Sequence, residues 1–147
     1  RSPEVMGDFI SMNKVIASSL SEIKEEVILQ THVTNPLVSL ATFEQACDQY
    51  YDSLIKGHDS VFSVNAYQKR FFDKNLRPIN HDPQRLLRTQ DLDPVYVENS
   101  CIYIFSKSSF ERSKARIGQA PNIFIMDEYE SIDIDWPNDL EIVKKLI

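Results

Sequence analysis

Apolar residues along the chain alternate between helical spacing and short continuous runs. A first set recurs every three or four residues, which predicts a helix that Asp8 can cap: Phe9, Met12, Ile16 and Leu20. Short apolar runs bounded by polar residues predict buried strands: Val27–Leu29, Ser60–Val64, Cys101–Phe105 and Ile123–Met126. The alternation predicts an α/β fold in which helices flank a sheet.

Further apolar faces predict three more helices. The longest has Phe43, Cys47, Tyr50, Tyr51 and Leu54 on one face. It begins at Ser39 or Thr42 and ends at Gly57, where a glycine typically follows a helix. Ser108–Glu111 resembles a capping box that opens a short helix. Leu140, Val143 and Ile147 line one face of a C-terminal helix.

One long segment, Tyr67–Pro94, is polar, irregular and proline-containing. A stretch of that length with little periodicity inside a compact domain is either a functional excursion or a disordered loop. Residues 1–147 are otherwise expected to form one domain, because their number suffices for a single core.

Composition narrows the function classes. The net charge is −6, which argues against non-specific binding to nucleic acid or anionic membranes. No apolar run approaches the roughly 20 residues of a membrane span, and Arg1–Ile10 has no signal-peptide pattern. Two cysteines, Cys47 and Cys101, are expected as reduced thiols rather than a disulfide, as in a cytoplasmic protein. Because the first residue is Arg1, the natural start is expected to be missing.

The sharpest local signal is the run Ile132-Asp133-Ile134-Asp135. In an extended strand the two isoleucines point into the core, and the two aspartates project together about 7 Å apart. Adjacent carboxylates repel unless a cation lies between them, and Mg²⁺ accepts one or two carboxylates with phosphate oxygens and water. The alternative is a solvated strand end in which Asp135 caps the last helix.

A second candidate is Arg88, followed by Thr89-Gln90-Asp91. A guanidinium binds two oxygens of a carboxylate or phosphate at once, so Arg88 can anchor an anionic substrate. The alternative is an exposed basic loop. Among the histidines, His32 ranks above His58 and His81, because it follows a strand, where ligands bind in α/β sheets. None of the three glycines belongs to a glycine-rich phosphate loop.

Six segments together resemble the acylneuraminate cytidylyltransferase (CMP-N-acetylneuraminic acid synthetase) family, over essentially the whole chain and in order. Leu29–Leu37 looks like a variant of that family's LQPTSPL loop, and Glu130–Asp135 looks like its IDID motif. The other four segments are Ser60–Val64, Arg77–Pro83, Arg88–Leu92 and Glu98–Phe105, the last followed by Arg116-Ile117-Gly118.

The resemblance implies a Rossmann-like nucleotide-diphospho-sugar transferase fold with a mixed, mostly parallel sheet. It implies a homodimeric enzyme that joins CTP to an α-keto acid sugar and releases pyrophosphate, with Mg²⁺ bound by Asp133 and Asp135. In such enzymes an arm reaches across the dimer into the partner's sugar pocket, and residues 66–91 fall in its place. The implied substrate-binding residues are His32, Thr34, Asn35, Arg88, Gln90 and Asn99.

Two departures from the family leave alternatives open. Aligned on Thr34–Leu37, the slot of the family's sugar-contacting glutamine holds His32. The sugar can therefore be sialic-acid-like, 3-deoxy-manno-octulosonate, or another nonulosonate such as legionaminate or pseudaminate. The family's phosphate-binding N-terminal segment has no counterpart here, so the chain resembles the C-terminal two-thirds of the domain. No catalytic residue is identifiable in it, and it is expected to be inactive alone. The remaining alternative is that the protein is a non-catalytic remnant of such an enzyme, which serves in dimerisation or sugar binding.

Overall fold

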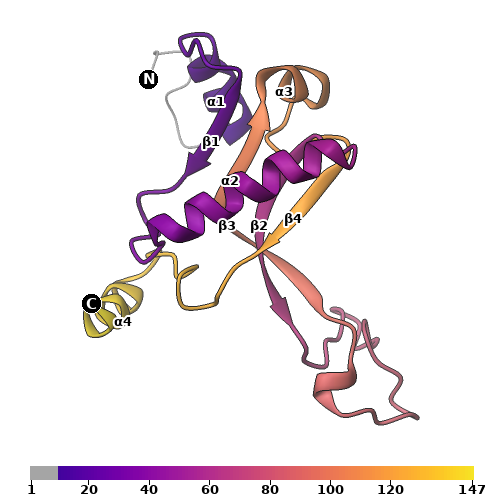
Figure 1. Ribbon diagram of the computed structural model, residues 1–147. Coiled ribbons are helices and arrows are strands. Elements are labelled where there is room, and N and C mark those ends of the chain that lie inside the picture. Colours follow the sequence, from indigo (N-terminus) through magenta and orange to yellow (C-terminus); the bar gives the residue numbers. More distant parts are fainter. Residues whose placement is uncertain (1–9) are drawn as a thin grey trace.

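The computed structural model describes residues 10–147, which form a mixed sheet flanked by helices (Figure 1). Asp8 and Phe9, expected at the start of the first helix, lie outside the described residues. The elements in chain order are α1 (Met12–Leu20), β1 (Val27–Thr31), α2 (Leu40–Ile55), β2 (Ser60–Tyr67), the 3₁₀ turn η2 (Thr89–Asp91), β3 (Val95–Ser106), α3 (Lys107–Ser113), β4 (Pro121–Ile125) and α4 (Pro137–Leu146).

The sheet has the strand order β1-β3-β2-β4 within the described residues. β1, β2 and β4 run in one direction, and β3 runs against them between β1 and β2. The mixed α/β fold expected from the sequence is confirmed. Because the reversed strand lies inside the sheet, however, only the β2–β4 pairing is parallel. β3 is reversed because it returns from β2 like the second arm of a long hairpin.

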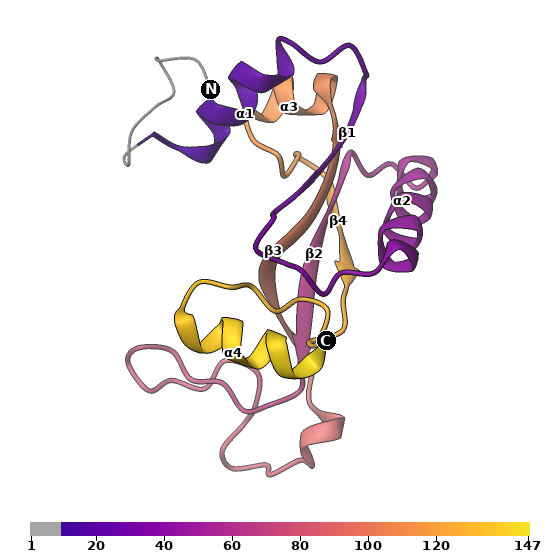
Figure 2. The same ribbon diagram turned by 90° about the vertical axis from the view of Figure 1, so that its left-hand side faces the viewer.

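The core is divided between the two faces of the sheet. On one face Ala46 and Tyr50 of α2 pack against Val61, Ile102 and Ile104. On the other face α1 and α3 contribute buried residues to the second cluster, which comprises Ile16, Leu20, Tyr103, Phe105 and Phe110. Figure 2 shows α2 on one side of the sheet, with α1 and α3 on the other. These layers place the polar ends of the strands at the edge of the core.

Side chains that accept backbone hydrogen bonds set the helix starts. Ser39 caps α2 by accepting from the N–H of Thr42, and Gly57 follows the helix with φ 87°. Both residues were expected at these ends. The short helix α3 begins earlier than the predicted capping box, because Ser106 rather than Ser108 accepts from the N–H of Ser109. Cys47 and Cys101 are both free thiols, as expected.

Residues 68–94, called the arm below, extend β2 and β3 beyond the end of the sheet (Figure 1). Hydrogen bonds from side chains, rather than a hydrophobic core, hold this segment in place. Asn80 accepts from the N–H of Phe71 at 3.0 Å and donates to the carbonyls of Lys69 and Asp93. Gln68 donates to the carbonyl of Leu92 at 3.1 Å. These hydrogen bonds give the segment a defined conformation.

Across residues 10–147 we find no helix with both the length and the apolar character needed to cross a bilayer.

Candidate functional site

Two segments that each follow a strand meet at one end of the sheet. The first, residues 32–39, links β1 to α2; the second, residues 126–136, links β4 to α4. The N–H of Ile134 donates to the carbonyl of Thr34 at 2.9 Å, and the amide of Asn35 donates to the carbonyl of Ile132 at 3.4 Å. Figure 1 shows the yellow C-terminal segment reaching the beginning of α2. The structure therefore brings the LQPTSPL-like and IDID-like segments into contact.

The predicted strand over Ile132–Asp135 is wrong, because these residues form an irregular segment without a pairing strand. A bend at Trp136 and the start of α4 at Pro137 follow directly. Asp139, rather than Asp135, caps that helix by accepting from the N–H groups of Asp135 and Trp136 at 3.1 and 2.8 Å. The alternative of Asp135 as a helix cap is therefore also wrong.

Asp133 and Asp135 differ in environment. Asp133 is half-buried, and its Oδ1 atom is buried without a hydrogen-bond partner among the described residues. Asp135 is exposed. An unsatisfied buried carboxylate oxygen is costly, and a bound cation is one way to satisfy it.

The carboxylates fit a cation that takes few protein ligands. In residues 10–147, no three His, Cys, Asp or Glu side chains gather as a metal site. Mg²⁺ remains compatible, because it takes one or two carboxylates together with phosphate oxygens and water.

Another buried polar group, the amide of Asn99, lies in β3. Register breaks between β2 and β3 at Ser63, where Phe62 pairs with Tyr103 but Val64 pairs with Glu98. Asn99 lies in the extra length of β3, and its Oδ1 accepts from the Ser63 hydroxyl at 2.5 Å and from the N–H of Cys101 at 3.2 Å. Its Nδ2 is buried with no partner in the described part of the chain. The Asn99 amide group is therefore oriented through its Oδ1, and its Nδ2 donor is unpaired among the described residues.

The negative charge of Asp133 contributes to the raised pKa of the Cys101 thiol. Burial, followed by the charges of Asp133 and Glu130, raises the pKa of Cys101 to about 12. The thiol is therefore neutral at physiological pH and lies within electrostatic reach of the carboxylates. This closeness links the IDID-like segment to the middle of β3, next to Asn99.

Two contacts that sequence reasoning missed hold the turn before the aspartates. Thr42 of α2 donates a hydrogen bond to the carboxylate of Glu130. Asn65 of β2 donates to the Ser131 hydroxyl at 2.8 Å and accepts from it at 3.2 Å. Asn65 was identifiable in principle, because an amide at a position 6% exposed inside a strand needs a polar partner.

The loop after β1 contacts its neighbours mainly through backbone groups. Thr34 offers its carbonyl to Ile134, and Asn35 is buried, with its Oδ1 unpartnered within residues 10–147. His32 is half-buried at the end of β1, and its Nε2 lies 3.3 Å from the Nε2 of Gln30. Thus His32, Thr34, Asn35, Asn99, Asp133 and Asp135 all belong to this end of the sheet.

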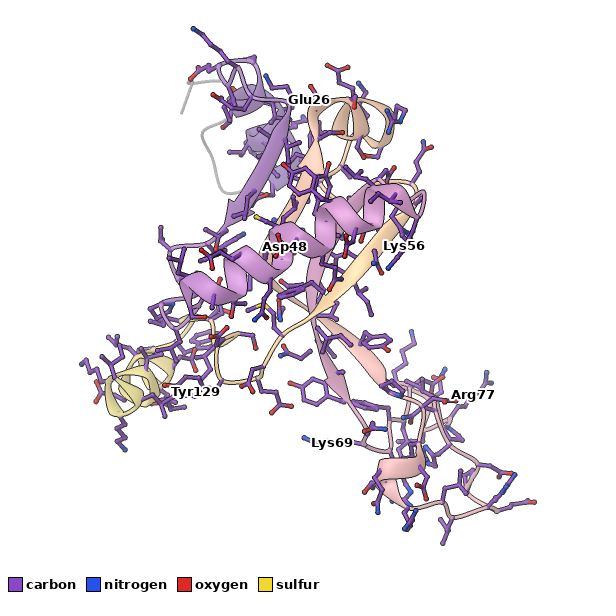
Figure 3. The ribbon with its side chains drawn as sticks, viewed as in Figure 1. Glu26, Asp48, Lys56, Lys69, Arg77 and Tyr129 are labelled. Atoms are coloured by element: carbon purple, nitrogen blue, oxygen red, sulfur yellow. The ribbon has the colours of Figure 1, made fainter. Side chains whose placement is uncertain are left out.

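Arg88 and Gln90 do not join that group within the chain. Both lie on the arm, which projects away from β1 and α2 (Figure 3, where Lys69 and Arg77 mark the arm and Tyr129 marks the turn before α4). Arg88 makes a two-point contact with Asp91, with Nε–Oδ2 at 2.7 Å and Nη2–Oδ1 at 2.9 Å. Gln90 accepts from Gln68 through its backbone carbonyl at 3.3 Å.

A second polar cluster surrounds Tyr103, on the face of the sheet that α1 and α3 cover. Arg116 stacks its guanidinium 3.6 Å from the centre of the Tyr103 ring and donates to the Tyr103 hydroxyl at 2.9 Å. Tyr103 also donates to Glu98. Burial and the hydrogen bond to Glu98 raise the pKa of Tyr103 to about 12. Tyr103, Glu98 and Arg116 thus bind one another, while Nη1 of Arg116 is buried without a partner among the described residues.

The fold has a relative among solved structures. Superposition on 4-diphosphocytidyl-2C-methyl-D-erythritol synthase from Anaerococcus prevotii gives a TM-score of 0.62 at 11% identity, over 92% of this chain and 66% of that one. The chain therefore has the Rossmann-like nucleotide-diphospho-sugar transferase fold. At this identity the likeness concerns the fold alone.

Sequence relatives narrow the comparison further. The chain is 29% identical to N-acylneuraminate cytidylyltransferase of Oncorhynchus mykiss over 93% of its own length. It is 26% identical to the enzyme of the same name from Streptococcus agalactiae serotype III over 95% of its length. It spans 33% and 35% of these two proteins, respectively. No protein-family model matches the chain.

Proposed function

We propose that the protein activates a sialic-acid-like α-keto acid sugar with CTP, giving the CMP-sugar and pyrophosphate. The observation that carries this proposal is the hydrogen bond between Ile134 and Thr34. It joins the LQPTSPL-like and IDID-like segments, so that their polar residues lie at one end of the sheet. The similarity to two N-acylneuraminate cytidylyltransferases across more than nine-tenths of the chain supports it.

In this proposal Asp133 and Asp135 hold Mg²⁺ together with phosphate oxygens of CTP. The bound ion would offset the negative charge of the phosphates. Asp133 fits this role because its Oδ1 lacks a partner among the described residues, and Asp135 fits because it is exposed to an incoming ligand. The backbone bond from Ile134 to Thr34 keeps both carboxylates at the loop after β1.

The substrate-binding residues have separate tasks. Asn99 directs its Nδ2 donor at a sugar oxygen, because Ser63 and Cys101 fix its Oδ1. His32 and Asn35 contact the sugar from the loop after β1. Correct placement of two substrates supplies much of the rate enhancement in phosphoryl-group transfer, where the protein forms few covalent bonds.

Arg88 serves a second copy of the chain in this proposal. The arm holds six basic residues (Lys69, Arg70, Lys74, Arg77, Arg85, Arg88) and four acidic ones (Asp73, Asp82, Asp91, Asp93), although the whole chain has a net charge of −6. The Arg88 side chain is 73% exposed, and Asp91 occupies only one edge of its guanidinium. Its remaining donors suit a sugar carboxylate in the partner subunit of a homodimer.

The test is pyrophosphate release by the full-length protein with CTP and Mg²⁺ across a panel of acids. The panel contains N-acetylneuraminate, legionaminate, pseudaminate and 3-deoxy-manno-octulosonate. Release with one acid, and none without acid or with UTP in place of CTP, supports the proposal and identifies the sugar. A folded protein that releases pyrophosphate with none of them overturns the proposal in favour of a binding or dimerisation role.

A further inference from the structure

Gln30 and His32 lie on the same side of the chain at the end of β1. Alternate residues of an extended strand point the same way, so the two side chains meet across Thr31. The Nε2 atoms of Gln30 and His32 are 3.3 Å apart. An amide nitrogen has only hydrogens to offer. The His32 nitrogen that faces it therefore accepts, and in a neutral ring the proton must lie on Nδ1.

Gln30 is a fixed partner for that ring. Its residue pairs with Tyr103 on the inner strand β3, and its Oε1 is buried without a partner in residues 10–147. Gln30 also forms a polar end of the otherwise largely apolar groove between α1 and β1, which Ile16, Ile28 and Phe105 line. The half-buried side chain thus presents its amide nitrogen to the His32 ring.

The backbone also places His32. The N–H of Asn35 donates to the carbonyl of His32 at 3.2 Å, which closes a turn directly after the strand. The ring is thus held between the end of β1 and the loop that contacts the IDID-like segment. With Nε2 turned toward Gln30, Nδ1 is the ring nitrogen left for a ligand.

We propose that Gln30 is a positioning residue that holds His32 as the Nδ1–H tautomer, so that the ring donates one hydrogen bond to a carbonyl or carboxylate oxygen of the sugar. The assignment of the acceptor to the sugar rests on the proposed function; the pairing of Gln30 with His32 does not. A glutamine in the slot of His32 would offer both a donor and an acceptor. The pair found here offers a donor only, and so favours substrates that present an oxygen acceptor there.

The direct test is the protonation of each His32 ring nitrogen, read by long-range ¹H–¹⁵N correlation spectra of the full-length protein labelled with ¹⁵N-histidine. His32→Ala assigns the signals. In the wild type we expect the proton on Nδ1. Gln30→Glu replaces the donor with an acceptor of the same shape and should move the proton to Nε2. Gln30→Met removes the partner and should give a mixture of tautomers, which keeps the test valid if the carboxylate disturbs folding.

Kinetics of the same variants distinguish a positioning role of Gln30 from a general effect on the structure. Loss of one oriented hydrogen bond should raise KM for the sugar about five- to tenfold in Gln30→Glu, with KM for CTP within about twofold of wild type. Gln119→Glu adds the same charge on an exposed turn at the other end of the sheet and should change neither constant.

A wild-type proton on Nε2, or a tautomer that stays unchanged in both Gln30 variants, overturns the pairing. An Nδ1–H tautomer that responds to Gln30 supports it even if no sugar releases pyrophosphate, because that second result contradicts only the proposed function.

Discussion

The N–H of Ile134 donates to the carbonyl of Thr34 at 2.9 Å and joins two loops that are far apart in the sequence. The amide of Asn35 adds a contact to the carbonyl of Ile132. The aspartate side chains on either side of Ile134 take no part in either bond. The junction therefore depends on backbone and on Asn35, which leaves Asp133 and Asp135 available for ligands.

Replacing the aspartates should separate activity from stability. We expect Asp135→Ala to lower turnover about 100-fold or more, because several kcal/mol of charge stabilisation at the phosphates would be lost. The unfolding midpoint should change little, since Asp135 is exposed and its N–H contact to Asp139 is a backbone one. The measurement is pyrophosphate release beside thermal unfolding. Glu128→Ala, an exposed acid in the preceding turn, is the control, and a near-normal rate in Asp135→Ala would remove the metal assignment.

Removing Arg88 should weaken the sugar rather than the nucleotide. A charge-assisted hydrogen bond contributes about 1.5–3 kcal/mol, so Arg88→Ala should raise KM for the sugar roughly 10- to 100-fold. KM for CTP should stay within about twofold. Arg77→Ala removes an equal charge from the same exposed arm and should have little effect on either. Equal losses for both substrates in Arg88→Ala would mean that Arg88 only braces the arm through Asp91.

Gly118 should not tolerate a side chain. A Cβ atom there would lie 2.1 Å from the Oδ1 of Asp59. That carboxylate accepts from the N–H groups of Gln119 and Ala120 at 3.0 and 3.1 Å, ahead of β4. Gly118→Ala must displace it, and we expect the free energy of unfolding to fall by about 2–3 kcal/mol.

Chemical denaturation of a double-mutant cycle checks the cause of that loss. If the clash with Asp59 is responsible, Gly118→Ala should cost much less in an Asp59→Ala background. Additive losses would instead show that the two positions act independently.

The stability of the protein should fall in alkali. The pKa of Cys101 rises from 9.0 to about 12 and that of Tyr103 from 10.0 to about 12, in both cases first because of burial. Above about pH 9 the unfolded chain therefore releases protons that the folded chain keeps. The unfolded state then binds fewer protons, so the free energy of unfolding decreases as pH rises through this window.

Denaturant unfolding at about pH 8 and about pH 10.5 measures this effect. Cys101→Ala and Tyr103→Phe should each reduce the loss of stability between the two pH values. Tyr96→Phe, which removes a hydroxyl from a side chain 46% exposed, should not. An alkaline loss that is the same in all three variants would contradict the burial of the two groups.

The periodicity of apolar residues predicted the elements well where burial is one-sided. α2 has its expected start at Ser39, and the four apolar runs all contain strands. The prediction that Val27–Leu29 is buried was wrong, because β1 lies at the edge of the sheet and none of its residues is fully buried. Strand direction was less accessible, because a single sequence does not reveal that β3 inserts between β1 and β2. The length of β3 was also underestimated, since its first half, Val95–Ser100, is only partly buried and carries polar residues.

The site was predictable by residue but not by geometry. Alternation of Ile132 and Ile134 with aspartates indicated a strand, yet the segment lacks a partner and Asp139 ends it by capping α4. The contacts of Asn99 with Ser63 depend on a register break between two strands, for which the sequence carries no local signal. The pairing of Gln30 with His32 was accessible in hindsight from their spacing of two in a strand.

Following each phosphate of CTP tests the central claim most directly. The full-length protein would be incubated with its sugar and CTP labelled with ³²P at the α or the γ position. We expect the α label to move to the sugar and the γ label to appear in pyrophosphate. A protein carrying both Asp133→Ala and Asp135→Ala should neither label the sugar nor release labelled pyrophosphate. Release of the γ label as inorganic phosphate, or transfer of the α label that survives loss of both aspartates, would contradict it.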